Sequence, residues 1–578
     1  MRKLLHRETD GTYIVHGAEY TLRIDGHTIA VDIENNNFAT LDVRCAVPKT
    51  MDDDSGAIPD HEPSVPTLTE VQEETGQVVF IWENESTLWK KTYTLTCDWL
   101  RFHFALTLHG SGRVDEIWYF SGNLGGRWGS AYEFQEGFTP CISWYNEEEY
   151  SFKASMNCHR WSVLMVPPMF CYAFRCMNMT RRLGLGLVAR RGEHNFHSFD
   201  YRVSHSSAFR EGFALVTDQH GHVTVDGYWT APAIIGYSGD DQWDVLRKYT
   251  DYYFTSGIAI PNPRNQTPRF WHGPLVCGWI EQMIRGVTTD TDTPIADLAC
   301  QRIYESIAEE VRKHNLHPAA MIIDDKWQKY YATDEADPEK WPDLRGFVDR
   351  NLENGIRTML WFKLWDPDGW NKDLCVTADN GDVLLDPSHP EFLANLDTAL
   401  HRILSDDEGC YNCAGMKLDY AFINPIGRKV HTYSGKYGVE LLYDMQAYIY
   451  KKSKEIKSDA LINCSPCHPY FAHICDHARL HDYDAKNRNN REDLTMRAKL
   501  FSIAMPGVLL DTDNAGFHSY RDTMHWQLNQ QMVGVPDLYS LIGTESCPMD
   551  DADYAAIAQM WDEYNRKIDA LYGGESWM

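Results

Sequence analysis

AAMIIDDKWQ, residues 319–328, joins a short apolar run to two adjacent carboxylates. Its apolar half has the length of a buried strand, and the charged residues follow without an intervening turn. GMKLDY, residues 415–420, repeats this arrangement with Lys417 and Asp419 at the end of another short run. In a barrel of parallel strands, functional side chains lie at the carboxyl ends of the strands. The two segments therefore predict a parallel α/β fold with charged groups gathered at one face.

The same rhythm of short apolar runs and helical patterns continues from residue 269 to residue 578. The predicted strands are 275–280, 319–323, 357–362, 415–418, 460–464, 474–481, 507–510 and 538–542. The predicted helices are 294–314, 341–354, 390–404 and 551–572. Eight strand–helix units in about 300 residues predict a (β/α)8 TIM barrel.

The first 235 residues have a different pattern, in which apolar and polar residues alternate. Examples are the segments 20–24, 92–96 and 100–104, separated by turn signals such as Asp25-Gly26. Alternation with turn signals predicts an antiparallel β-sandwich over residues 1–235. A helical pattern at 240–257 and a segment with three prolines follow, so residues 236–268 are predicted to be a helical linker. The chain is thus expected to be multidomain β plus α/β, with the sandwich preceding a catalytic barrel.

Composition narrows the class of partner. The 578 residues are enough for a large barrel and a companion, and the hydrophobic fraction of 43% is typical of a soluble globular protein. The formal net charge of −29 disfavours nucleic acid and anionic membrane surfaces, whereas it does not repel a neutral substrate. The 19 Trp and 31 Tyr suit both sugar sites and cores.

The cellular location is also predicted from sequence. The N-terminal stretch MRKLLHRETDGTYIVHG has basic residues but no apolar signal core, and no apolar run reaches transmembrane length. The 15 cysteines are an odd number without the density of a disulfide-rich secreted domain. We therefore expect a cytoplasmic protein with reduced thiols and a substrate small enough to be imported.

Charged residues end several of the predicted strands. Asp324 and Asp325 follow the second strand, Asp419 ends the fourth, and Asp482 and Asp513 come at the ends of the sixth and seventh. Carboxylates that face one bowl suit glycoside hydrolysis, which needs two of them in complementary roles.

Five motifs together resemble the alkaline α-galactosidase and raffinose synthase branch of glycoside hydrolase family 36, in clan D. They are GWIEQMIRGVT (278–288), IIDDKWQ (322–328), KLD (417–419), RLHD (479–482) and GVPDLYS (534–540). Their order and placement match that family over roughly residues 270–545. The resemblance implies a TIM-barrel, retaining, exo-acting α-glycosidase that needs no cofactor or metal. It also implies a small-molecule carbohydrate as partner, and the oligomers common in the family leave a homo-oligomer open.

The resemblance assigns roles by position. Asp419 would be the nucleophile that forms a covalent glycosyl-enzyme, and Asp482 the acid/base, with the nearby Asp484 as a second candidate. Asp324 and Asp325 would accept hydrogen bonds from sugar hydroxyls, and Lys417 would hold another hydroxyl. The remaining expected substrate-binding residues are Lys326, Trp327, Trp361, Cys464, Arg479, His481 and Asp513.

The sequence departs from the family pattern at two positions. Lys326 stands where the family motif has glycine, so a side chain would narrow the pocket or contact an acidic group of the substrate. His481 replaces the serine of the acid/base motif. Structural alternatives remain for single residues, because Asp419 could form an ion pair with Lys417, and Trp327 and Trp361 could both belong to the core.

The expected function is hydrolysis of terminal α-galactosyl residues of small oligosaccharides or glycosides. Three alternatives stay open: an α-galactosyl transferase like raffinose synthase, an α-glycosidase for another, modified or acidic sugar, and an inactive carbohydrate-binding scaffold. The Cys-x-x-Cys pairs at 410–413 and 464–467 suggest a zinc site as one interpretation. They are much further apart in sequence than in a compact zinc ribbon, so reduced thiols within the barrel are expected instead.

Overall fold

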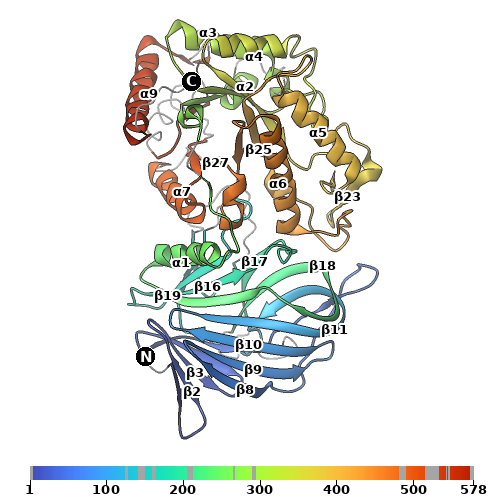
Figure 1. Cartoon of the computed structure of the whole chain (residues 1–578), viewed down its shortest axis with the longest axis vertical. Helices are drawn as coiled ribbons and strands as arrows, with labels where there is room; N and C mark the ends of the chain where they lie inside the picture. Colours follow the sequence, from blue (N-terminus) through green and yellow to red (C-terminus); the bar gives the residue numbers. More distant parts are fainter. Residues whose placement is uncertain are drawn as a thin grey trace.

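The computed structural model combines antiparallel sheets, up to residue 239, with eight parallel strands that begin at residue 275 (Figure 1). It describes residues 4–123, 128–140, 150–158, 165–204, 212–263, 267–288, 294–480, 490–513, 533–539, 541, 543–544 and 547–572. Among these residues, every helix is too short or too polar to span a bilayer.

Two antiparallel sheets build the N-terminal part. The six-stranded sheet has the order β1 (Leu5–Arg7), β2 (Tyr13–His16), β3 (Thr21–Asp25), β4 (Thr28–Ile33), β5 (Asn36–Asp42) and β12 (Ala131–Tyr132). The main path of the thirteen-stranded sheet is β14 (Ser151–Lys153), β13 (Glu136–Phe138), β15 (Cys171–Arg175), β16 (Arg182–Val188), β19 (Ala233–Gly239), β11 (Phe102–Tyr119), β10 (Lys90–Asp98), β9 (Gln77–Glu85) and β8 (Thr67–Glu74). Pairing off that path are β6 (Lys49–Thr50), β7 (Ala57–Ile58), β17 (Phe199–Val203) and β18 (Phe213–Thr230). Burial alternates along β9 and β10, as expected for strands with one face on a core.

The parallel strands form a nearly closed barrel. Their order is β20 (Leu275–Cys277), β21 (Ala320–Ile323), β22 (Arg357–Lys363), β25 (Gly415–Asp419), β26 (Leu461–Cys464), β27 (His477–Arg479) and β28 (Leu509–Asp511), with β29 (Asp537–Leu538) on the other side of β20. A single parallel bridge between Asp511 and Val535 joins β28 to the segment that enters β29. The hairpins β23 (Cys375–Thr377) with β24 (Val383–Leu385) and β30 (Gly543–Thr544) with β31 (Cys547–Pro548) lie outside this ring.

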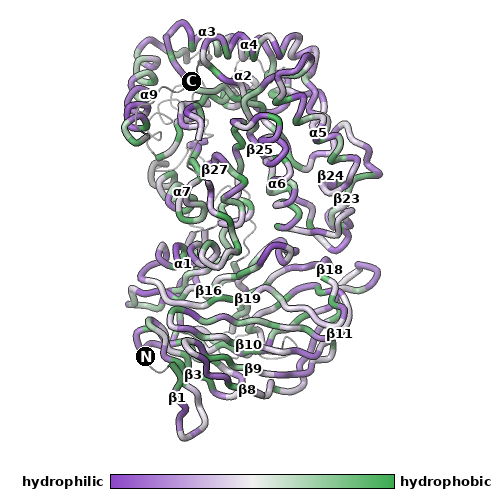
Figure 2. The backbone as a smooth tube through the Cα atoms, in the orientation of Figure 1, coloured by the Kyte–Doolittle hydropathy of each residue, from purple (hydrophilic) through white to green (hydrophobic). Residues whose placement is uncertain are grey.

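Helices connect most of these strands. The α-helices are α1 (Gln242–Thr255), α2 (Trp279–Thr288), α3 (Gln301–Lys313), α4 (Leu344–Glu353), α5 (Pro390–Leu404), α6 (Gly438–Ile456), α7 (Asn490–Ala504) and α9 (Asp551–Tyr572). The 3-10 helices are η2 (Arg269–His272), η3 (Ile295–Leu298), η4 (Lys372–Leu374), η5 (Ala421–Ile423) and η6 (Pro469–Ile474). Figure 2 shows the hydrophobic colour along barrel strands such as β27 and the hydrophilic colour over the outer helices α3 and α4.

Several predicted elements differ from the structure at their ends. The first strand stops at Cys277 because the chain turns at Gly278, where a Cβ would lie 2.2 Å from the Tyr304 hydroxyl. The predicted helix 294–314 is divided into η3 and α3, since Cys300 has an extended backbone. The sixth strand begins only at His477, because the preceding residues form η6.

A buried apolar cluster lies among the barrel strands. Leu275, Ile322, Met359 and Leu461 belong to this buried cluster. Gly415 begins β25 among them, and a Cβ there would lie 2.1 Å from the Leu461 carbonyl oxygen. Only glycine therefore allows β25 and β26 to approach so closely. This packing holds the strand that carries Lys417 and Asp419.

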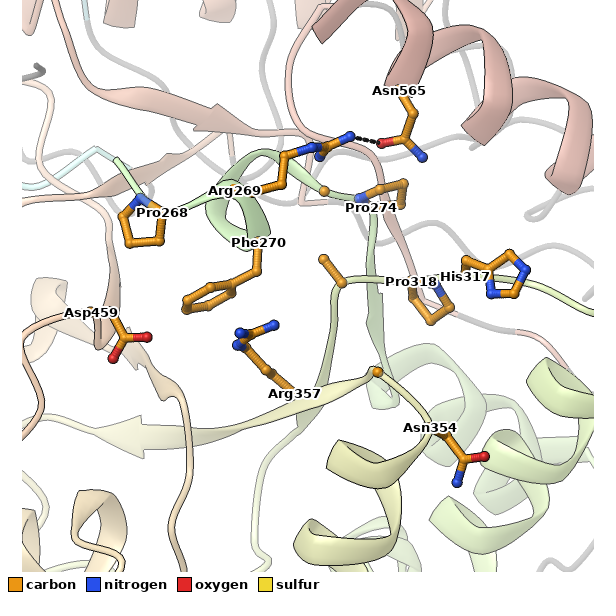
Figure 3. A pocket seen from close by; sticks show the side chains of 13 residues that line it. Pro268, Arg269, Phe270, Pro274, His317, Pro318, Asn354, Arg357, Asp459 and Asn565 are labelled. Carbon is orange, nitrogen blue, oxygen red and sulfur yellow. Dashed lines mark hydrogen bonds between the residues drawn. The ribbon is translucent and has the colours of Figure 1, made fainter. Parts of the chain in front are cut away.

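A cavity of about 300 Å³ opens at the amino ends of β20, β21 and β22 (Figure 3). The Arg357 guanidinium lies 4.3 Å from the centre of the Phe270 ring at its edge. Pro274 and Ala319, which directly precede two of the strands, also line it. The cavity is thus at the opposite end of the barrel from the strand ends that carry the predicted site.

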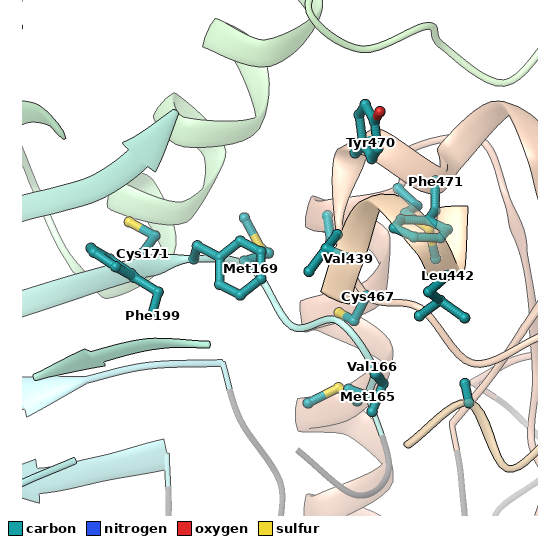
Figure 4. Close-up of a cluster of buried hydrophobic side chains, with 14 of the residues drawn as sticks. Met165, Val166, Met169, Cys171, Phe199, Val439, Leu442, Cys467, Tyr470 and Phe471 are labelled. Atoms are coloured by element: carbon teal, nitrogen blue, oxygen red, sulfur yellow. The ribbon is translucent and has the colours of Figure 1, made fainter. Parts of the chain in front are cut away.

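The antiparallel sheets and the barrel share one apolar core (Figure 4). Met169 and Phe199 come from the sheet side, and Leu442 of α6 and Phe471 of η6 come from the barrel side. Polar contacts reinforce this junction. The Arg428 guanidinium donates to both carboxylate oxygens of Asp115 at 2.6 and 2.9 Å. The loop that follows β25 is therefore anchored on the N-terminal sheet.

Candidate active site

The carboxyl ends of the barrel strands bring the predicted polar residues together. β22 and β25 are parallel neighbours in which Trp361 is level with Lys417, and Lys363 with Asp419. Residues two apart on a strand point to the same side, so Lys417 and Asp419 share one face. Ion pairs from Lys417 to Asp324 and from Arg479 to Asp419 show that the end of β21 and β27 reach the same place.

Among the described residues, three donors hold Asp419 by hydrogen bonds. Its Oδ2 accepts a hydrogen bond from Trp361 Nε1 at 3.0 Å, and its Oδ1 accepts from Arg479 Nη2 at 2.9 Å. The third donor is the backbone N–H of Tyr420, at 2.8 Å from Oδ1. Tyr420 has φ +62°, and this left-handed turn lets the N–H face back to the carboxylate. The Asp419 side chain remains 24% exposed, whereas that of Arg479 is 1% exposed, so the carboxylate is fixed yet accessible.

Lys417 lies deeper in the barrel than Asp419. Its Nζ is 3.0 Å from Asp324 Oδ2, 3.6 Å from Asp513 Oδ1 and 3.1 Å from the Tyr539 hydroxyl. Burial alone would lower the pKa of Lys417, but the charges of Asp324 and Asp513 hold it well above its usual value. Lys417 is therefore the counter-ion of these two carboxylates, and its contact with a sugar stays a prediction.

The two adjacent carboxylates after β21 have different surroundings. Asp324 is buried and accepts hydrogen bonds from Lys417, from the Cys277 thiol at 3.0 Å and from the backbone of Asp325 at 2.8 Å. Asp325 is only half-buried, and its Oδ1 accepts from the Tyr331 hydroxyl at 2.8 Å. Burial raises the pKa of Asp325 to about 6, although the Tyr331 hydrogen bond opposes the rise. Asp325 is the one of the two that has room to meet a ligand.

Lys326 adopts φ +74°, a conformation in which glycine costs least. This backbone angle explains the glycine of the family motif at the same position. The Lys326 side chain turns to Asp368, with Nζ 2.7 Å from Oδ2, and lies 3.6 Å from the centre of the Tyr331 ring. These contacts offset a strain of about 1 kcal/mol for a residue with a Cβ.

Three of the residues predicted to bind substrate are buried in this structure. Trp327 is 0% exposed, and its indole N–H donates to the Trp361 carbonyl oxygen at 2.7 Å, so it belongs to the core. Trp361 is 1% exposed and holds Asp419 through its N–H instead of offering a stacking face. Cys464 is buried, with its Sγ near the carbonyl oxygens of Ile462 and Ile474. Its strand neighbour Asn463 is the residue of β26 that faces the carboxylates.

A cluster of buried carboxyl groups lies behind Lys417. Asn463 Nδ2 donates to Asp511 Oδ2 at 2.5 Å, and the Asp513 backbone N–H donates to Asp511 Oδ1 at 3.0 Å. Burial raises the pKa of Asp513 to about 6, while Lys417 and Arg479 oppose the rise. Burial and the charge of Asp511 raise the pKa of Asp537 well above its usual value. Burial therefore favours the protonated form of these carboxyl groups.

The predicted acid/base residues Asp482 and Asp484, and His481 beside them, lie outside the described residues. The neighbouring Arg479 is described, and it donates to Ser465 Oγ at 2.7 Å in addition to Asp419. Its Nε is also 3.8 Å from Asp513 Oδ2. Arg479 is thus placed between the proposed nucleophile and the buried acids, and the acid/base assignment stays a prediction.

Sequence reasoning missed several residues that this site contains. They are Cys277, Tyr331, Lys363, Asn463, Ser465, Asp537 and Tyr539. The polar Asn463 within the otherwise apolar fifth strand was a usable signal, because a buried amide needs a partner. Tyr331 follows the strand in a loop, where no periodicity indicates its direction.

Trp361→Phe is expected to lower kcat about ten- to a hundredfold, because Asp419 loses a charge-assisted hydrogen bond. Steady-state kinetics on the best substrate measures this effect. Trp341→Phe is the control, since its buried indole N–H donates to the Ala299 carbonyl oxygen at 2.7 Å, away from Asp419. An equal loss of kcat in both variants would show that the effect comes from general packing.

Comparison with known proteins identifies the fold. The sequence matches no protein-family model and no curated protein. A GH31 family sulfoquinovosidase from E. rectale, solved with an aza-sugar inhibitor, is similar over 97% of this chain and 83% of its own, with 12% identity and a TM-score of 0.57.

Two further solved structures are similar over nearly the whole chain. The GH36 α-galactosidase AgaA from Geobacillus stearothermophilus has 11% identity and a TM-score of 0.53 over 96% of this chain and 86% of its own. The α-N-acetylgalactosaminidase NagBb from Bifidobacterium bifidum has 10% identity and a TM-score of 0.60 over 96% and 93%. The chain therefore has the fold of these glycoside hydrolases, an antiparallel β part joined to a parallel barrel.

Proposed function

We propose that this protein is a retaining, exo-acting α-glycosidase that hydrolyses terminal α-galactosyl residues of small oligosaccharides or glycosides. The observation that carries the proposal is Asp419, a partly exposed carboxylate at a barrel strand end, immobilised by Trp361 and Arg479. An oriented carboxylate with its charge stabilised by fixed donors suits nucleophilic attack on an anomeric carbon.

In the proposed reaction, a carboxylate oxygen of Asp419 bonds to the anomeric carbon as the bond to the leaving oxygen breaks. Asp482, or alternatively Asp484, protonates that oxygen and then removes a proton from the water that releases the sugar. A retaining pair of this kind stands about 5–5.5 Å apart. Asp325 accepts hydrogen bonds from the sugar hydroxyls, while Lys417 forms an ion pair with Asp324 behind it.

The two lysines beside Asp325 already form ion pairs with carboxylates, which favours an uncharged sugar over an acidic one. Lys326 Nζ is 2.7 Å from Asp368 Oδ2, and Lys363 Nζ is 2.8 Å from Asp366 Oδ2. An anionic substituent would have to compete with these carboxylates for either lysine. The choice of galactose among neutral sugars rests on the family resemblance of the IIDDKWQ and KLD motifs.

A panel of aryl α-glycosides tests this proposal. We expect the α-galactoside to exceed the α-glucoside, the α-N-acetylgalactosaminide and the sulfonated α-sulfoquinovoside in kcat/KM by about a hundredfold. Proton NMR should show the α anomer as the first product. Preference for the sulfonated sugar would overturn the neutral substrate, and a β anomer as first product would overturn retention. Excess sucrose in the same assay separates hydrolysis from transfer.

A further inference from the structure

Tyr331 is the side chain that connects the cations of this site with Asp325. It lies in the loop after β21, with the Lys326 ammonium 3.6 Å and the Lys363 ammonium 4.2 Å from its ring centre. The Trp361 ring is a further neighbour, with 5.9 Å between ring centroids. Each ammonium group is attracted by the electron-rich face of an aromatic ring.

The fixed ring aims its hydroxyl group at Asp325. The Tyr331 hydroxyl oxygen is 2.8 Å from Asp325 Oδ1. Burial and the Asp325 charge raise the pKa of Tyr331, so the phenol keeps its proton and acts as the donor. The contact occupies Oδ1 and therefore leaves Oδ2 of Asp325 for another donor.

We propose that Tyr331, held by Lys326 and Lys363, is a positioning residue that orients Asp325 and keeps it ionised for sugar binding. The inference rests on the proposed function, because it assigns Asp325 to a sugar hydroxyl. Tyr331 would act through Asp325 and would not touch the reacting atoms.

The charges around Asp325 make this role measurable as a pH dependence. Asp324 and Asp419 raise the pKa of Asp325, whereas the Tyr331 hydroxyl and Lys363 lower it. Lys340 is a further cation whose own pKa responds to Asp325. Because the Asp325 pKa is already about 6, loss of the Tyr331 donor would move it into the neutral range.

Tyr331→Phe keeps the ring between the lysines and removes only the hydroxyl. We expect the acidic limb of kcat/KM to move up by about one pH unit and KM to rise about tenfold near pH 6, with kcat at pH 8 little changed. Tyr330→Phe is the matched control, since this neighbouring tyrosine is 42% exposed. An unchanged acidic limb and KM in an active Tyr331→Phe enzyme would overturn the inference.

A second measurement does not require activity. The hydrogen bond to Tyr331 stabilises ionised Asp325, so the difference in unfolding temperature between wild type and Tyr331→Phe should grow as pH rises from 4 to 8. This pH-dependent increase in the difference in unfolding temperature should vanish when both proteins also carry Asp325→Asn. If this increase is seen but no α-glycoside is hydrolysed or bound, the hydrogen bond from Tyr331 to Asp325 is confirmed and the proposed function fails. A difference independent of pH would reject the positioning role itself.

Discussion

Asp419→Asn is expected to lower hydrolysis of an activated aryl α-galactoside by about 10⁴-fold or more, because the amide cannot form the glycosyl ester. The substitution keeps the side-chain shape, and the amide oxygen can still accept from Arg479 Nη2 and the Tyr420 N–H, whereas the NH2 group then faces the Trp361 N–H without accepting from it. Initial rates measured over long incubations, with the variant purified away from host glycosidases, give the residual activity.

The matched control for this variant is Asp397→Asn on α5. Asp397 accepts hydrogen bonds from the Tyr448 hydroxyl at 2.7 Å and from Lys452 at 3.2 Å, and it is far from the strand ends in sequence and contacts. It should retain wild-type turnover. An unfolding temperature of Asp419→Asn close to wild type would confirm that its fold is intact. Turnover of the Asp419 variant within tenfold of wild type would refute the nucleophile assignment.

Lys417→Met is expected to be the most destabilising single change in the site, at about 3–5 kcal/mol near pH 8. The variant leaves Asp324 and Asp513 buried without their shared cation. Lys417 also lowers the pKa values of Asp511 and Asp537, so their values would rise further without it. A carboxyl group whose pKa is higher in the folded than in the unfolded protein destabilises the folded state as pH rises above the unfolded-state pKa. The deficit should therefore be smaller at pH 5 than at pH 8.

Urea unfolding at both pH values measures this difference. Lys452→Met is the control, because its ion pair with Asp397 is exposed and should contribute less than about 1 kcal/mol. A loss from Lys417→Met that is the same at both pH values would show that lost packing, and not uncompensated charge, causes the effect.

Helices whose flanking residues mark both ends were predicted best from sequence. The helices predicted at 390–404 and 551–572 agree with α5 and α9, because their apolar stripe and their flanking residues both mark the ends. The strand ends were harder to predict, since packing at a distance sets them. The turn at Gly278 depends on Tyr304 from α3, which no local pattern around residue 278 indicates.

The site was predicted to the extent that strand geometry controls it. Lys417 and Asp419 share a face because the period of a strand is two, and the structure places them so. Trp327 and Cys464 were assigned to the pocket from their position after a strand, but their direction depends on the register and on tertiary burial. Asn463, one residue before Cys464, had the correct direction.

The apolar core that the antiparallel sheets share with the barrel has a consequence for how this chain can be divided. Met169 and Phe199 of the sheets belong to the same buried apolar cluster as Leu442 of α6 and Phe471 of η6 (Figure 4), so the antiparallel sheets help to keep water from α6 and η6. A gene fragment that began at the barrel would encode a protein in which the apolar side of α6 and η6 is exposed to water. Such a protein would tend to aggregate. The antiparallel sheets are therefore expected to be required for a stable barrel. Exchanging them between distant relatives would require matching substitutions on both sides of the shared apolar core.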